Sequence, residues 1–179
     1  NVDYTPWLDD AYPDGDCVGG LEAIDINQSS YTRGIPIRIA ADGTWGLAQD
    51  FKPTVNTLMR VELLLQRYGS PGYDLIVELH DGDPDGPLLD TQTFAPSEVS
   101  DSGYEWLSVD FEDTAVTPGN SYSIVLAPPM VTGDYFGYTW AFTEGDPYTD
   151  GDLWYTRTGG SVWYEVPFIY EFAFRTFGA

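Results

Sequence analysis

Short apolar segments with an alternating pattern recur along most of the chain, and they constrain the fold more than any other feature. In one of them, Phe172 and Phe174 share one face of an extended strand, and Glu171 and Arg175 share the other. Turn sequences rich in Gly, Pro and Asn fill nearly every gap between such segments. The expected strands are residues 35–40, 45–51, 57–67, 73–80, 88–94, 105–111, 121–127, 135–142, 153–156 and 169–177.

This arrangement predicts an all-β protein. A single helical turn is expected at residues 95–102, with Ser97 as its N-cap. No strand is followed by a long helical segment, which excludes the α/β folds. Many short strands in one domain are typical of two packed layers, so we expect a two-sheet antiparallel β-sandwich of the jelly-roll type.

The first 33 residues differ in character from the rest of the 179-residue chain. They are rich in Asp, Gly and Ser and show weaker periodicity, so we expect an N-terminal acidic and polar arm at 1–33 and a β-sandwich domain at 34–179. The arm is expected to pack against its own sandwich or against a neighbouring chain. It contains the sequon Asn27-Gln28-Ser29, which predicts N-glycosylation at Asn27.

The charge balance restricts the partners. The chain has 29 acidic and 7 basic residues and a net charge of −22. Phosphate backbones and anionic lipids are bound by Lys and Arg, so we expect neither nucleic-acid binding nor membrane insertion. The acidity fits an extracellular or cell-surface setting where cations screen the carboxylates, or a soluble acidic surface without further meaning.

Three acidic runs are candidate calcium sites. In the middle one, Asp81, Asp83 and Asp85 precede Gly86 and match the first half of an EF-hand loop. Position twelve of that loop is Gln92, which offers no bidentate carboxylate, and no helices are expected on either side, so a helical EF-hand is excluded. A strand-connecting calcium loop and a charged β-turn both remain open.

The other two runs share the pattern D-x-Y-x-D-G-D, at residues 146–152 and 10–16. In the later copy, a tight turn at Gly151 would let Asp150 and Asp152 face one ion, with Asp146 reaching the same point. We therefore expect a structural calcium ion there.

The earlier copy would contribute Asp14 and Asp16 to a second site or to a junction between subunits. Cys17 follows it and is the only cysteine, so no internal disulfide can form.

From Trp45 onward the sequence resembles a β-sandwich accessory module of archaeal and bacterial secreted and cell-surface proteins. The resemblance is carried by residues 47–53, 60–65, 74–79, 81–87, 116–119, 122–126, 146–154 and 172–178. It implies a jelly roll, an extracellular setting and a carbohydrate-binding role. Residues 1–8 resemble the segment that closes a right-handed parallel β-helix in surface proteins.

Four aromatic residues follow the last acidic run: Trp154, Tyr155, Trp163 and Tyr164. Aromatic faces stack on the C–H faces of sugar rings, and carboxylates accept hydrogen bonds from sugar hydroxyls. These residues are therefore a candidate glycan site. The alternative is that they fill the core, as we expect for Trp106 and Trp140.

Catalytic motifs are missing from the sequence. It contains no G-x-S-x-G elbow, no H-E-x-x-H and no phosphate-binding glycine loop. His80, the only histidine, is expected at a strand end as an ordinary rim residue. We therefore expect a non-enzyme.

Two functions follow from these features. The first is a non-catalytic, calcium-stabilised extracellular module that binds carbohydrate or another surface polymer. The second is a structural subunit that binds copies of itself in a filament, sheath or surface layer, with residues 1–33 making the subunit contacts.

Overall fold

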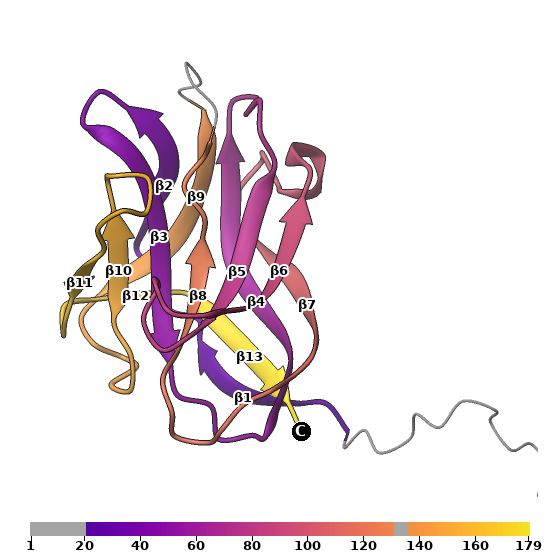
Figure 1. Cartoon of the computed structure of the whole chain (residues 1–179). Coiled ribbons are helices and arrows are strands. Elements are labelled where there is room, and N and C mark those ends of the chain that lie inside the picture. The colour runs from indigo at the N-terminus through magenta and orange to yellow at the C-terminus, as the bar shows by residue number, and fades with distance from the viewer. Residues whose placement is uncertain (1–20, 131–135) are drawn as a thin grey trace, which may run out of the picture.

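The computed structural model describes residues 21–130 and 136–179 (Figure 1). These residues form thirteen strands and one 3₁₀ turn, and the strands pair antiparallel. The elements are β1 (Ala23–Gln28), β2 (Arg33–Ala40), β3 (Gly43–Phe51), β4 (Thr57–Tyr68), β5 (Leu75–Asp81), β6 (Leu88–Phe94), η1 (Pro96–Glu98), β7 (Glu105–Ala115), β8 (Tyr122–Leu126), β9 (Gly137–Glu144), β10 (Leu153–Thr156), β11 (Tyr164–Val166), β12 (Tyr170–Phe172) and β13 (Phe174–Gly178). The predicted all-β class is confirmed.

Strand β2 connects two groups of strands, because it changes partner along its length. Its first residues pair with β9 from Arg33 to Ile37, and its last pair with β3 from Arg38 to Ala40. The strand order is β1-β13-β4-β9-β2-β3-β8-β5-β6, with β7 and β12 pairing beside the first group and β10 and β11 beside the second. We call β1, β13, β4, β9, β7 and β12 the β4 group, and β3, β8, β5, β6, β10 and β11 the β8 group.

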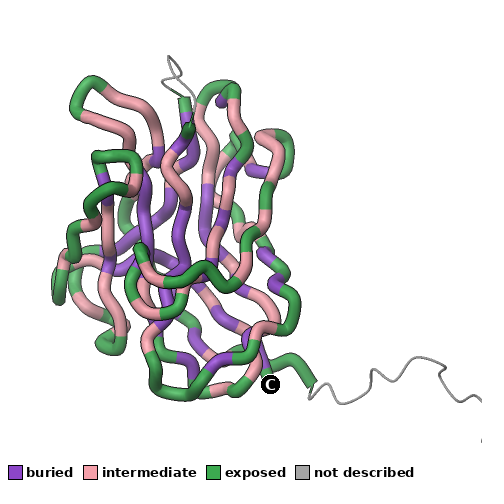
Figure 2. The backbone as a smooth tube through the Cα atoms, in the orientation of Figure 1, coloured by how far each residue is buried: buried purple, intermediate pink, exposed green. Residues whose placement is uncertain are grey.

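Both groups contribute side chains to one hydrophobic core. Val61 and Leu63 of β4, Leu47 of β3 and Ile124 of β8 are all fully buried in it. The rings of Phe51 in β3 and Phe174 in β13 lie 6.2 Å apart across it. Figure 2 shows the buried residues along the central strands and the exposed ones in the turns. The core therefore forms where the two groups meet.

The predicted strand at 169–177 is two strands in the structure. β12 pairs with β9, and β13 pairs with β4. Ala173 lies between them, where its N–H donates to Ala141 O at 2.8 Å and its carbonyl accepts from the Trp140 indole at 2.9 Å. Phe172 and Phe174 are both fully buried.

One local prediction was wrong, and one strand was missed. The turn at residues 95–102 shortens to η1, and Ser97 lies within it rather than at its cap. Glu98 closes this turn, since its carboxylate accepts the N–H of Ala95 at 2.7 Å. The described end of the N-terminal arm also contains an unpredicted strand, β1, which pairs with β13 of the same chain.

The described residues contain no helix that is long and apolar enough to cross a membrane. Asp14, Asp16 and Cys17 lie outside the described residues, so their predicted roles stay predictions.

Candidate functional site

The outward face of the β8 group contains a groove. In β5 and β8, Leu79 pairs with Ile124 and both fill the core, so the neighbouring pair Glu78 and Val125 points away from it. These two side chains and Ile76 form the floor of a groove of about 300 Å³. Its walls are Pro84 and Asp85 from the β5–β6 turn, Gly159, Gly160 and Trp163 from the β10–β11 loop, and residues 127, 128 and 130 after β8.

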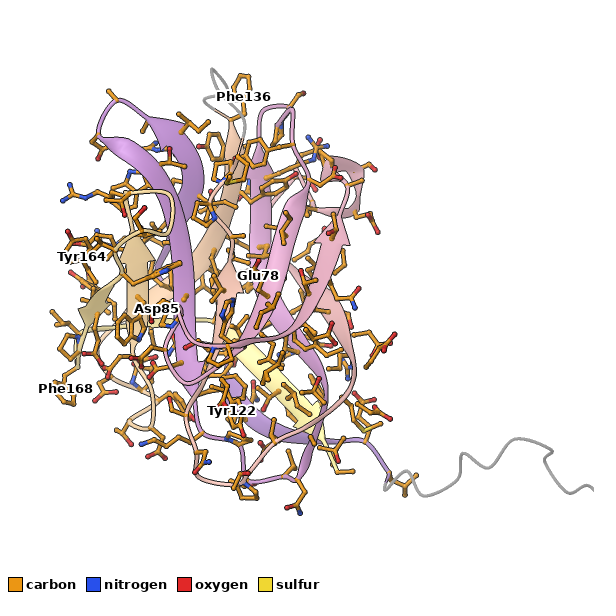
Figure 3. The ribbon with its side chains drawn as sticks, viewed as in Figure 1. Glu78, Asp85, Tyr122, Phe136, Tyr164 and Phe168 are labelled. Atoms are coloured by element: carbon orange, nitrogen blue, oxygen red, sulfur yellow. The ribbon has the colours of Figure 1, made fainter. Side chains whose placement is uncertain are left out.

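The β5–β6 turn is a closed hairpin turn. Asp81 N donates to Pro87 O at 2.9 Å, and Gly86 N donates to Asp83 O at 2.8 Å. A Cβ at Gly86 would lie 2.0 Å from the carbonyl oxygen of Asp81, so only glycine fits there. The run therefore forms a hairpin turn, which places Asp85 on the groove (Figure 3), and calcium binding by this loop stays a prediction.

His80 connects this turn to the groove floor. Its Nδ1 lies 2.8 Å from Gly86 O and its Nε2 lies 2.9 Å from Glu78 Oε2. Burial lowers the pKa of His80, but the hydrogen bonds to Glu78 and Gly86 and the charges of Glu78 and Asp85 outweigh it, so the pKa is raised. His80 thus holds one groove carboxylate in place.

The β10–β11 loop is held by its own hydrogen bonds. Thr158 Oγ1 accepts the N–H of Val162 at 2.8 Å, one residue before Trp163. Gly159 and Gly160 have φ of 67° and 92°, a left-handed conformation that glycine adopts without steric cost. The loop therefore presents Trp163 to the groove from a defined backbone.

The four predicted aromatic residues are divided between two faces. Tyr155 stacks on Tyr164 with ring centroids 5.4 Å apart and on Trp45 at 5.6 Å. Tyr155 packs against the core, whereas Trp154 points to the opposite side of β10. Only Trp163 of the four lines the groove.

The sequence analysis did not include Trp45 in the aromatic cluster, because its contact with Tyr155 depends on the register between β3 and β10. Of the two expected core tryptophans, Trp140 is fully buried, while Trp106 is partly exposed under the guanidinium of Arg175.

A second, larger hollow lies between β6 and β7. It measures about 550 Å³ and is lined by Gln92 and residues 110–113. Phe111, its one aromatic residue, is 1% exposed and belongs to the core. This hollow offers no aromatic face to a ligand, so we favour the groove at Trp163.

The acidic loop 146–152 is attached to β3. Asp50 Oδ1 accepts the N–H of Asp152, and Asp50 N donates to Asp152 O at 3.2 Å. Asp152 Oδ1 accepts the N–H of Phe168 at 3.0 Å, which ties the loop to the β11–β12 turn as well. Gly151 was predicted to allow a tight turn. In the structure it allows the loop to pack closely on β3, because a Cβ there would lie 2.0 Å from Asp50 O.

The pKa of Asp50 is raised, chiefly by burial and also by the charge of Asp152, while the Asp152 N–H opposes the shift. The Trp154 indole opposes it too, although its buried Nε1 has no hydrogen-bond partner within normal distance among the described residues.

Glu171 is a buried acid beside this loop. Its side chain is 0% exposed, and its Oε2 accepts a hydrogen bond of 2.6 Å from Gln49 Nε2. Gln49 is fixed in turn, because its Oε1 accepts the N–H of Phe172 at 2.9 Å. Burial, opposed by the Gln49 bond and aided by Asp152, Asp146 and Asp50, raises the pKa of Glu171 to about 9.

The alternating pattern predicts that Glu171 and Arg175 share the strand face opposite Phe172 and Phe174, and it predicts no function for Glu171. In the structure Arg175 is partly exposed and Glu171 is buried, because the strand is interrupted between them.

Of the predicted calcium ligands in the loop 146–152, Asp150 is exposed. Asp146 is partly buried, and its Oδ1 has no hydrogen-bond partner among the described residues. Within residues 21–130 and 136–179, no three His, Cys, Asp or Glu side chains form a preassembled metal-binding group. The predicted site at Asn27 is exposed on β1, where its Oδ1 accepts a hydrogen bond from Arg175 Nε at 3.1 Å.

Neither a protein-family model nor a curated protein matches this chain.

Proposed function

We propose that this chain is a non-catalytic extracellular β-sandwich module of the jelly-roll type that binds carbohydrate. The sharing of one core by the β4 and β8 groups supports a two-layer sandwich. The observation that carries the binding function is the groove, which combines the Trp163 ring with Glu78 and Asp85.

The lining of the groove favours neutral sugars. Trp163, Ile76 and Val125 supply the apolar surface that sugar C–H faces require, and Glu78 and Asp85 can accept hydrogen bonds from hydroxyls. Among the described lining residues there is no Lys or Arg. With a net charge of −22 on the whole chain, an anionic polysaccharide would be repelled.

Native gel electrophoresis through neutral polysaccharides, followed by titration calorimetry with an oligosaccharide of the retarding polymer, tests this function. We expect retardation of the wild type and a loss of affinity of about tenfold or more in Trp163→Ala, since truncating an aromatic anchor of a binding site costs about 2 kcal/mol.

Trp45→Ala is the matched control. Trp45 is partly exposed, bonds to Asp42 at 3.0 Å and lies outside the groove, so this variant should bind like the wild type. Failure of the wild type to bind any neutral polysaccharide, or equal binding by folded Trp163→Ala, would contradict the proposal.

Calcium belongs to the same proposal as a structural ion at the loop 146–152. It would offset the repulsion among Asp50, Asp146, Asp152 and Glu171, and it would stabilise the fold because a ligand of the native state raises the free energy of unfolding. Thermal unfolding with calcium and with chelator measures this contribution.

A second candidate function is self-assembly. β6 lies at the end of the strand order, and its Leu88 and Leu89 are 53% and 40% exposed. An exposed edge strand with apolar side chains can pair with another copy. Micrographs that show polymers, absent in a Leu88→Lys variant, would favour this function over the first.

A further inference from the structure

Two carboxylate oxygens in the interior have no hydrogen-bond partner among the described residues. They are Glu171 Oε1 and Asp146 Oδ1, and both atoms are buried from solvent. A buried oxygen without a donor loses its hydration without compensation, which is costly for a carboxylate. The two oxygens therefore need a partner, which can be a proton, a buried water molecule or a cation.

The surrounding groups are acidic and already fixed by the protein. Glu171 Oε2 is occupied by Gln49, Asp50 Oδ1 by the Asp152 N–H, and Asp152 Oδ1 by the Phe168 N–H. These bonds orient the carboxylates from three segments: β3, the loop 146–152 and the β11–β12 region. The charges of Asp152, Asp146 and Asp50 all act on Glu171, so the site has a strong negative potential.

We propose that Glu171 Oε1 and Asp146 Oδ1 are the protein ligands of a divalent cation, calcium, that is bound beneath the loop 146–152. This inference rests on the calcium part of the proposed function. It differs from the ligand set predicted from the sequence, because Glu171 takes the place of Asp150. Because no preassembled group of three such side chains exists among the described residues, carbonyl oxygens and water complete the coordination, as calcium readily allows.

Calcium differs from a proton or a water molecule in what it joins. A cation bound to both oxygens connects β12 to the loop 146–152, so it should raise the free energy of unfolding and depend on both carboxylates. A proton or a water molecule on Glu171 alone predicts neither effect.

The test uses the full chain after removal of metal by chelation. Calcium titrations at pH 7 are followed by calorimetry, which gives the affinity, and by thermal unfolding. In the wild type we expect a calcium-dependent rise in Tm, beyond that with sodium chloride of equal ionic strength.

Glu171→Gln is the deciding variant, because it matches the neutral acid in shape and can still accept the bond from Gln49. We expect a loss of calcium affinity of about tenfold or more and a smaller calcium-dependent rise in Tm. Asp146→Asn should lose affinity to a similar extent. Asp110→Asn is the charge-matched control, because Asp110 is exposed on β7 outside the acidic runs, and it should bind calcium as the wild type does.

Each negative outcome has one meaning. If calcium stabilises the wild type and Glu171→Gln equally, the assignment of Glu171 is wrong while a calcium site elsewhere stands. If calcium has no specific effect on the wild type, the partner of Glu171 is a proton or a buried water molecule, and the calcium part of the proposed function fails with it. Sugar binding is tested independently by Trp163→Ala.

Discussion

Gln49 and Glu171, separated by 122 residues in the sequence, are joined inside the core by a hydrogen bond of 2.6 Å from Nε2 to Oε2. The bond connects β3 of the β8 group to β12 of the β4 group. It also places an acid where no water reaches it, with Asp152, Asp146 and Asp50 near enough to disfavour its ionisation. Stability should therefore depend on pH through this residue.

The first prediction concerns the metal-free free energy of unfolding. The pKa of Glu171 is about 9 in the native state against 4.5 as its ordinary value. Between these values the unfolded chain releases the proton and the native chain keeps it, so rising pH favours unfolding. Relative to Glu171→Gln, the wild type should lose up to about 1.4 kcal/mol per pH unit in this range.

Urea unfolding of both proteins in chelator, at pH values from 4.5 to 9, measures this difference. Glu171→Gln should be the more stable protein at pH 7, and the two should converge near the lower limit. Parallel pH profiles would show that Glu171 ionises normally in the native state.

The second prediction concerns Gly151. Its Cα lies so close to β3 that a Cβ would be 2.0 Å from Asp50 O and 3.0 Å from Tyr148 Cε1. Because backbone must move to relieve the first contact, Gly151→Ala should lower the free energy of unfolding by about 2 kcal/mol or more. Urea unfolding in chelator measures the loss without a contribution from metal.

Gly145→Ala is its control in the preceding turn. Gly145 has φ of 96° with no atom within 4 Å of an added Cβ, so it should cost only the backbone strain, about 1 kcal/mol. A loss in Gly151→Ala no larger than this would show that the loop separates easily from β3.

Strands with a clear alternating apolar pattern were predictable from the sequence. Strands that form only because a neighbouring strand pairs with them were missed. β1 has only Ile24 and Ile26 as alternating apolar residues, and it is a strand because β13 offers it an edge. β11 is three residues long and depends on its pairing with β10.

The candidate site was predictable only in part, for a similar reason. Trp163 and Asp85 were named from their residue types, and the fold brings them to one groove from β10–β11 and β5–β6. Glu78 was not named, since an acid in a strand usually faces solvent. Glu171 was placed on one face with Arg175 and given no role, because its burial depends on a contact with Gln49, far away in sequence.

The third prediction concerns the titration of His80. Both imidazole nitrogens face acceptors, Glu78 Oε2 and Gly86 O, and only the protonated ring can donate to both. The pKa is raised above 6.5, so the added stability is complete below that pH and is lost as pH rises through the native pKa. NMR of this single histidine should give a pKa above 6.5.

Glu78→Gln should lower the pKa of His80, because it removes the charge while an amide oxygen can still accept the bond. Asp110→Asn, on β7, is a charge-matched control that should leave it unchanged. A wild-type pKa at or below 6.5 would mean that burial outweighs both hydrogen bonds.

The fourth prediction links the β10–β11 loop to sugar binding. Thr158 Oγ1 accepts the N–H of Val162 at 2.8 Å and thereby fixes the backbone that carries Trp163. In Thr158→Val this bond is lost while the side-chain shape is kept, so the loop should sample more conformations. We expect weaker polysaccharide binding by about threefold to tenfold, with Tm nearly unchanged, because ordering the loop then opposes association.

Ser161→Ala separates this effect from a general loosening of the loop. Ser161 Oγ donates to Thr158 O at 3.2 Å at an exposed position, and its loss leaves the Thr158–Val162 bond intact. This variant should bind like the wild type. Equal affinities of Thr158→Val and the wild type, at equal Tm, would show that Trp163 needs no preordered loop, whereas a matching fall in Tm would make the effect one of stability.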